Sequence, residues 1–357
     1  MYRLSFFGAI HLAQGRLVWN DALGHKQFPL TLAHFRAIVA SVYPLQRITE
    51  HTSSADESTI NDLLQKNVLV APNSGRALLE EELMRKWQAW GTYTRLYHFS
   101  SRTVIGSPFL NEQSDSERLR MKFELFPPPK RWAMSDMYAQ RETVALPNPV
   151  TISKNYIDVL RARRSPIKVV GPAVSLENVS TILRMCAGLD DRNNEVDARS
   201  GNYFRYAPSG GARASVEVFL CARNIKELRE GCYWYLADTH KLRRIGTFPD
   251  SATLGISLNQ QIRFTEAPLF FVIAGNLEAV MWKYQTGRAY RDLFWDAGHV
   301  GQILQMTASA LGLDSVFTIV QDDEVWENIL GISPADMPIL GVYAVGHGRD
   351  RKDVNIV

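Results

Sequence analysis

The stretch APLFFVIA, residues 267–274, is the longest wholly apolar run in this chain of 357 residues. It has the length of a buried strand and is far shorter than the ~20 residues that span a bilayer. Upstream of it, residues 216–222 alternate so that every second side chain shares one apolar face, as in a strand. Residues 231–237 are predicted to be the antiparallel neighbour of that strand.

Helical patterns flank these strands. Ser175 can cap a helix over 176–187, and Gly188 follows its end. A longer pattern over 290–311 is rich in small residues, which let helices pack closely, often at a domain or dimer contact. The last predicted elements are a strand at 315–320, a helix at 324–330 and a strand at 339–345. Strands and helices mix without a regular β-α-β rhythm, so the sequence predicts an α+β fold.

Two compositional breaks divide the chain. Residues 111–117 are wholly polar, and prolines follow at 127–129, 147 and 149, so about forty residues here are typical of a connector. Before them, a hairpin over Gln14-Gly15 and a helix-helix-strand order predict a small winged-helix-like module. We therefore expect this module at 1–95, a connector at 96–150 and the main domain at 151–357.

The charge pattern disfavours nucleic acid as a partner. Lys and Arg number 40 against 37 Asp and Glu, a formal net charge of +3, which is too balanced for a surface that grips phosphates. The would-be recognition helix of the module carries Glu57, Asp62 and Lys66, and a net negative helix is repelled by phosphates. Docking of a peptide or partner protein, or a purely structural cap, fits the module better.

Other familiar site patterns do not occur in the sequence. The three cysteines form no CxxC pair, and no GxGxxG, GxxxxGK[ST], HExxH or GxSxG pattern is present; hence we expect no metal site, Rossmann site or hydrolase elbow. His299, among small residues of a predicted helix, is expected to be packed. The first residues do not resemble a secretory signal, so a cytoplasmic protein without membrane contact is expected.

Three short segments are suited to binding an anionic ligand. The segment RARRS, residues 161–165, places three guanidiniums and a hydroxyl together, which suits a phosphate as well as a solvated helix end. The segment APSGGA, residues 207–212, allows close backbone approach to a flat or anionic ligand, although an ordinary loop also fits. The segment VGHGR, residues 345–349, suits a phosphate or a frayed terminus equally.

The remaining candidate is the adjacent pair Lys283 and Tyr284, whose free pKa values both lie near ~10. A site that brings them together can lower the pKa of the tyrosine and make it a usable base. On a helix the two side chains point ~100° apart, and on a strand they point to opposite faces. Taken alone, the pair fits two ordinary surface residues better than a site.

Taken in order, these segments resemble the flavin-dependent nitroreductase superfamily, and within it the SagB-type dehydrogenases, the azoline oxidases that help make thiazole- and oxazole-containing peptides. The resemblance covers roughly residues 150–350 and rests on the order and spacing of the segments. It implies an antiparallel-rich α+β fold, preceded here by the N-terminal module, and a homodimer that binds FMN where two subunits meet.

The resemblance also implies roles for residues. The phosphate and ribityl chain of FMN would be held by Arg163, Arg164 and Ser165, with Arg349 as a further phosphate ligand. Pro208, Ser209, Gly210 and Gly211 would lie against the flavin from the other subunit, and Gly312 and Leu313 would line the cofactor. Many relatives carry a basic residue where this chain has Ile167, and Lys168 is the nearest substitute. Lys283 and Tyr284 match the catalytic signature of the family.

From this we expect an FMN-dependent dehydrogenase that aromatises thiazoline or oxazoline rings in a ribosomally made precursor peptide. Tyr284, assisted by Lys283, would take the proton, with the choice between the two residues left open, and FMN would take the hydride. The N-terminal module would dock a leader segment or a cyclodehydratase partner. Two alternatives stay open: an FMN oxidoreductase that acts on a small molecule with NAD(P)H, and a non-catalytic scaffold subunit.

Overall fold

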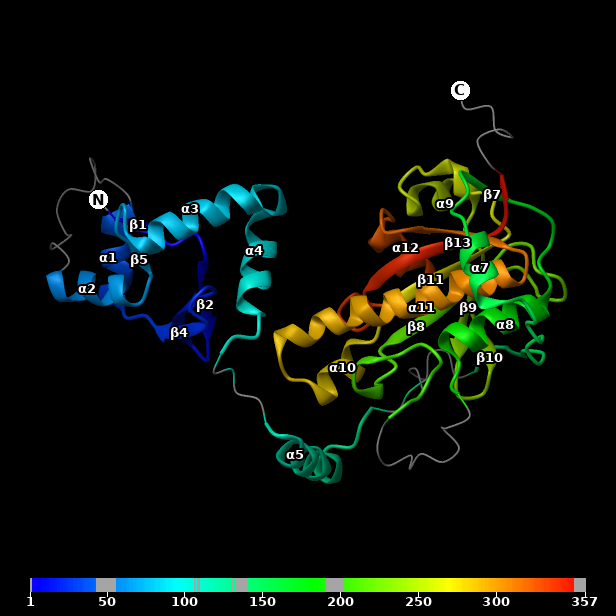
Figure 1. Cartoon of the computed structure of the whole chain (residues 1–357), viewed down its shortest axis with the longest axis horizontal. Coiled ribbons are helices and arrows are strands. Elements are labelled where there is room, and N and C mark those ends of the chain that lie inside the picture. The colour runs from blue at the N-terminus through cyan, green and yellow to red at the C-terminus, as the bar shows by residue number, and fades with distance from the viewer. Residues whose placement is uncertain are drawn as a thin grey trace. The chain divides into compact units, whose positions relative to one another are not determined.

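The computed structural model describes residues 2–42, 56–105, 107, 110–129, 131, 140–190 and 202–349. The chain divides into two compact units, residues 1–109 and 110–357 (Figure 1). The division falls after Phe109 rather than at the predicted residue 95, because helix α4 (Gly91–Ser100) belongs to the first unit.

The N-terminal unit begins with strands and continues with helices. Its three-stranded sheet has the order β2 (Gly8–Ala13), β3 (Arg16–Asp21) and β4 (Lys26–Pro29), and β1 (Arg3–Leu4) pairs with β5 (Leu69–Val70). Its longer helices besides α4 are α1 (Leu32–Val42), α2 (Glu57–Gln65) and α3 (Gly75–Trp87). The predicted hairpin turn forms at Gln14 and Gly15, whose φ values of 49° and 74° are typical of a tight hairpin turn.

A buried ion-pair network holds this unit together. Glu80 is fully buried and accepts hydrogen bonds from Arg3, Ser5 and Arg76. Arg76 also pairs with the buried Asp21, at 2.6 Å. Because a buried charge is tolerated only when it is paired, this network fixes α3 against β1 and β3.

The second unit is built on one large sheet, in which each strand is antiparallel to its neighbours. Its order is β12 (Asp314–Thr318), β13 (Ile339–Arg349), β11 (Leu269–Gly275), β8 (Val216–Ala222), β9 (Gly231–Leu236), β10 (Lys241–Gly246) and β6 (Thr143–Ala145). The apolar run quoted first is β11, which is wholly buried between β13 and β8. The short strand β7 (Lys168–Val170) pairs with the end of β13. The predicted α+β class is confirmed.

Helices cover both faces of this sheet. They are α7 (Tyr156–Ala162), α8 (Leu176–Ala187), α9 (Ser251–Ser257), α10 (Leu277–Lys283), α11 (Tyr290–Ala310) and α12 (Asp323–Leu330). Ser175 caps α8 as predicted, since its hydroxyl accepts from the Asn178 amide. In Figure 1, α11 crosses the sheet beside α8.

The alternation of side chains along the strands places α11 and α12 on opposite faces of the large sheet. A Cβ atom on Gly301 of α11 would lie 1.8 Å from the Tyr343 hydroxyl, so this helix rests on the Tyr343 face. Phe271 is the cross-strand partner of Tyr343 and shares that face. Phe270 points to the other face, where its ring lies 6.3 Å from that of Trp326 on α12.

The predicted connector is more structured than its composition indicates. It contains helix α5 (Glu112–Leu125), and its residues 143–145 form the edge strand β6. Both belong to the second unit. Within the described ranges, no helix is long and apolar enough to cross a membrane.

Candidate functional site

Three of the predicted cofactor-binding segments meet at one edge of the sheet. Lys168, which follows the 163–165 segment, pairs with Arg349 across β7 and β13. A Cβ atom on Gly348 would lie 2.7 Å from a Pro166 carbon and 2.8 Å from an Asp314 carboxylate oxygen. Residues 163–165, 312–313 and 348–349 therefore come together in one chain, and we call them the arginine group.

The arginine group offers donors to solvent. The Arg163 guanidinium donates to the Ser165 hydroxyl at 3.3 Å, and the side chains of Arg164 and Ser165 are exposed. Gly312 is exposed with φ of 79°, a conformation that favours glycine. Arg163 is half-buried, and a guanidinium beside a hydroxyl suits a phosphate.

Other predicted members of this group are placed differently. Leu313 is only 5% exposed and packs in the core. The ammonium of Lys168 pairs with Glu266 at 2.6 Å, so its charge is directed there. The backbone of Arg349 lies in β13, and its side chain is outside the described part of the structure.

An apolar surface continues from the arginine group along β12. Phe317 lies three residues beyond Asp314, about 10 Å along the strand, and stacks on Tyr343 at 4.7 Å between ring centroids. Phe317 and Ile319 are 44% and 64% exposed and line a cavity of about 290 Å³. Cationic donors at one end and an apolar surface further along fit the phosphate and flat ring of FMN. Sequence reasoning predicted this strand but not its role.

The second group gathers around the glycine loop at 208–211. Asp296 on α11 is 3% exposed and accepts from the Ser209 hydroxyl at 2.6 Å, the Gly210 amide at 3.0 Å and the Ser215 hydroxyl at 2.6 Å. His299, one turn further on, donates from Nδ1 to the Pro208 carbonyl at 3.1 Å. His299 is exposed, so the expectation that it is packed is wrong; its face of α11 points toward the loop.

The side chains of Lys283 and Tyr284 converge on this loop. The Lys283 ammonium donates to the Gly211 carbonyl at 3.1 Å. A Cβ atom on Gly211, whose φ is 59°, would lie 2.3 Å from the Tyr284 hydroxyl and 2.9 Å from the Lys283 nitrogen. The convergence is possible because α10 ends at Lys283 and Tyr284 is extended, with φ of −117° and ψ of 107°.

The surroundings favour a neutral amine over an ionised phenol. Burial, together with the nearby Arg213 guanidinium, lowers the pKa of Lys283. Burial, together with the carboxylates of Asp292 and Asp115, raises the pKa of Tyr284. The raised pKa of Tyr284 disfavours its ionised form, and the lowered pKa of Lys283 favours its neutral form. That either side chain acts as the base stays a prediction.

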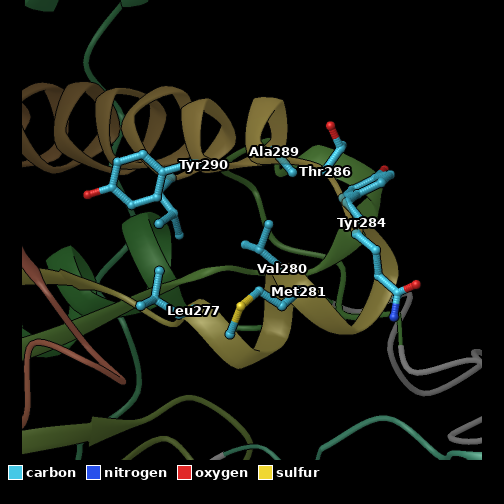
Figure 2. A pocket seen from close by; sticks show the side chains of 10 residues that line it. Leu277, Val280, Met281, Tyr284, Thr286, Ala289 and Tyr290 are labelled. Carbon is cyan, nitrogen blue, oxygen red and sulfur yellow. The ribbon is translucent and has the colours of Figure 1, made fainter. Parts of the chain in front are cut away.

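A cavity of about 630 Å³ opens beside Tyr284, between α10 and the start of α11 (Figure 2). Its walls are mostly apolar and are formed by Leu277, Val280, Met281, Ala289, Tyr290 and Leu293. Tyr284, Gln285 and Thr286 supply polar atoms. A largely apolar cavity of this size with few polar groups is typical of a small-molecule or side-chain binding site.

The two groups lie at different ends of α11 within one chain. Asp296 holds the glycine loop, whereas the arginine group lies beyond Ala310, and 14 helical residues between them span about 21 Å. One chain therefore does not bring Arg163 and Ser209 together. That Pro208, Ser209, Gly210 and Gly211 act from a second subunit stays a prediction.

Sequence reasoning missed three residues that build the second group: Asp296, Arg213 and Trp282. Asp296 lies within the predicted helix at 290–311, but no spacing rule connects it with Ser209, which is 87 positions away. Arg213 is buried, and its guanidinium lies 4.7 Å from the Trp282 ring centroid. Only the folded chain brings these side chains together.

Comparisons with known proteins bear on the sequence and the fold of the second unit. Residues 160–347 match the sequence profile of the Nitroreductase family. Over 159 residues the chain is 29% identical to MJ1384 of Methanocaldococcus jannaschii, a protein named as a nitroreductase, covering 44% of this chain and 75% of MJ1384. Over 185 residues it is 25% identical to the trifolitoxin-processing protein TfxB of Rhizobium leguminosarum bv. trifolii, covering 50% of this chain and 49% of TfxB.

A solved structure shares the fold. The crystal structure of a chain from Anabaena variabilis, named as a nitroreductase, matches with a TM-score of 0.51 at 20% sequence identity. The match covers 68% of this chain and 49% of that chain. The chain thus spans about half the length of TfxB and of the Anabaena chain.

Proposed function

Because the chain belongs to the nitroreductase family, we propose that it is an FMN-dependent dehydrogenase that oxidises thiazoline or oxazoline rings of a ribosomally made peptide to thiazoles or oxazoles. The observation that carries the proposal is the convergence of Lys283 and Tyr284 over Gly211, beside an apolar cavity. The similarity to TfxB, a protein named for processing trifolitoxin, supports a peptide as the substrate.

The reaction removes two hydrogens from the ring, one as a proton and one as a hydride. FMN, when bound, supplies the hydride acceptor. The neutral amine of Lys283 takes the proton from the ring carbon, because its lowered pKa leaves more of it unprotonated. Tyr284 stays protonated, so its hydroxyl donates a hydrogen bond that orients the ring. The mostly apolar walls of the cavity beside Tyr284 supply an apolar surface for the ring.

In this proposal FMN is bound by two copies of the chain. Arg163, Arg164 and Ser165 of one copy, together with Arg349, hold the phosphate, and the glycine loop of the other copy lies against the ring. Exposed aromatic side chains on α11 support a homodimer: Tyr290, Phe294 and Trp295 are 42%, 52% and 69% exposed. Tyr290 and Phe294 touch each other, with 5.3 Å between ring centroids, and adjoining exposed aromatic side chains are typical of a protein interaction surface.

Partner docking is assigned to the N-terminal unit. Leu12 and Leu32 are 74% and 64% exposed there, and Phe35 is 41% exposed. These side chains support docking of a precursor peptide, or of a cyclodehydratase that prepares its rings.

Substitution of the pair tests the reaction. Lys283→Ala is expected to lower kcat on a cyclised precursor peptide by about 10²–10⁴-fold, the usual contribution of a positioned general base. Tyr284→Phe is expected to lower it less, because only an orienting hydrogen bond is lost. Mass spectrometry of the peptide measures the loss of two hydrogens per ring, and the flavin absorbance checks that both variants keep FMN.

The exposed Lys226 supplies a matched control, since Lys226→Ala removes one ammonium far from the pair in sequence. Full activity in both Lys283→Ala and Tyr284→Phe would remove their assigned role. Rapid bleaching of the flavin by NAD(P)H would instead favour a small-molecule reductase, which the similarity to MJ1384 also supports. A colourless protein that takes up no added FMN would favour the scaffold alternative.

A further inference from the structure

Helix α5 is fastened to the residue that directly precedes Lys283. The Lys122 ammonium donates to the Trp282 carbonyl. The Trp282 indole donates to the Phe126 carbonyl at 2.8 Å, and the Phe123 ring meets the indole edge-on at 6.2 Å. Three residues near the end of α5 therefore contact one residue of α10.

The burial pattern of α5 agrees with this contact. Asp115, Arg118, Lys122 and Phe123 are half-buried, whereas Arg120 on the opposite side is exposed. Spacings of three and four residues place the half-buried side chains on one helical face. That face of α5 lies against the rest of the second unit, at Trp282.

Trp282 is held from its other side as well. The Arg213 guanidinium lies 4.7 Å from the indole centroid, close enough for a cation–π contact. Arg213 also donates from Nε to the Ala279 carbonyl in α10, at 3.1 Å. Trp282 thus lies between α5 and Arg213, and the direction of the next residue, Lys283, depends on this arrangement.

Helix α5 also contributes charge to the pair. Around Lys283 the charged groups are Arg213, Asp115 and Arg118, and around Tyr284 they are Asp292, Asp296, Asp115 and Arg213. Asp115 and Arg118 both come from α5 and form an ion pair at 2.7 Å. The electrostatic surroundings of the pair are therefore incomplete without this helix.

We propose that Lys122 and Trp282 are positioning residues that hold α5 against α10, so that this segment of the connector completes the Lys283–Tyr284 site. The role of the pair in oxidation rests on the proposed function, whereas the coupling of α5 to Lys283 does not. The connector between the N-terminal unit and the large sheet is, on this inference, part of the site.

The test measures the protonation of Lys283 directly in the full-length protein. The rate of reductive methylation of Lys283 is followed against pH by peptide mass spectrometry. Because burial lowers the pKa of Lys283, release of α5 moves its titration midpoint up, toward the ordinary lysine value of ~10.4. Lys122→Met is expected to give this upward shift. Arg120→Met, which removes a cation from the exposed face of the same helix, is expected to leave the midpoint unchanged.

A second variant distinguishes the effect of a loosened α5 on the Lys283 midpoint from the effect of the lost Lys122 charge. Phe123→Ala changes no charge and is expected to shift the midpoint in the same direction. An unchanged titration midpoint of Lys283 in both variants would overturn the inference. A shifted midpoint in Lys122→Met alone would also overturn it, because such a shift reports only the through-space effect of the lost Lys122 charge.

Turnover supplies an independent readout. If the wild-type protein oxidises azolines, Lys122→Met is expected to lower kcat by about ten- to hundredfold with little change in KM, because a small misplacement of a reacting group has effects of this size. A wild-type protein without azoline oxidation would overturn the proposed function and leave the methylation test intact. Unshifted midpoints beside normal oxidation would overturn only the coupling.

Discussion

At the scale of single residues, Gly211 is the point on which the candidate site depends. Its positive φ and the absence of a side chain let the Lys283 ammonium and the Tyr284 hydroxyl approach the same backbone atoms. Any side chain there meets both groups and adopts a backbone conformation that L-residues disfavour.

We therefore expect Gly211→Ala to abolish azoline oxidation while the protein still folds. The new Cβ atom would lie 2.3 Å from the Tyr284 hydroxyl, so this side chain must move. The strained φ costs about 1–2 kcal/mol of stability. Turnover and urea unfolding measure the two effects. Gly75→Ala, at a helix start with no atom within 4 Å of the added Cβ, is the control; wild-type turnover in Gly211→Ala would refute the argument.

The sequence identified this pair of residues but not their convergence. Adjacent residues on a continuing helix would point ~100° apart, and only the end of α10 at Lys283 turns Tyr284 toward the same glycine. The proposed choice of base also needed the fold, because one of the charges that act on Tyr284 comes from Asp115, which lies far earlier in the sequence.

At the scale of elements, α11 links the sheet, the glycine loop and the arginine group. Its Asp296 receives three hydrogen bonds from residues 209–215. Asp292, one turn earlier, has a raised pKa because of burial and the neighbouring Asp296 charge, so its negative charge is unfavourable there.

This difference gives a matched pair of substitutions. Asp296→Asn replaces one acceptor oxygen by a donor and leaves a buried hydroxyl or amide without its partner, at a cost of about 1–3 kcal/mol. Asp292→Asn removes an unfavourable charge and is expected to keep or increase stability. Urea unfolding followed by tryptophan fluorescence measures both. Equal losses in the two variants would contradict the assigned role of Asp296.

Elements with strong patterns were predictable from the sequence. Strands β8 and β11 and helix α8 follow from apolar periodicity and a serine cap. Helix α5 was missed because its sequence, EQSDSERLRMKFEL, is very polar and is followed by three prolines. Its attachment rests on a few contacts with Trp282, which leave no periodic signal in the sequence.

At the scale of the whole molecule, the two groups of site residues are separated along α11. The family resemblance implied that the glycine loop acts from a second subunit, but the spacing of the motifs did not show how far apart one chain keeps the two groups. That separation follows from the length of a helix whose two ends carry different groups, and it becomes visible only in the folded chain.

Mixing two inactive variants tests the shared site. Lys283→Ala removes a residue from the group around the glycine loop. A double Arg163→Glu, Arg164→Glu variant reverses two charges in the arginine group. Random re-association in a two-fold symmetric dimer gives mixed dimers with one intact site, so activity is expected to return to about one quarter of the wild-type value. Mass spectrometry of the product measures the recovery. No recovery in verified mixed dimers would show that each site lies within one chain.

If two copies share the site as proposed, the distance between the two groups on α11 makes the protein concentration a control of activity. On dilution below the dissociation constant of the dimer, the rate would fall with the square of the protein concentration, since each subunit alone would be inactive. A producing cell would then begin to mature its peptide only after enough copies had accumulated, which is a threshold set by mass action without any dedicated regulator.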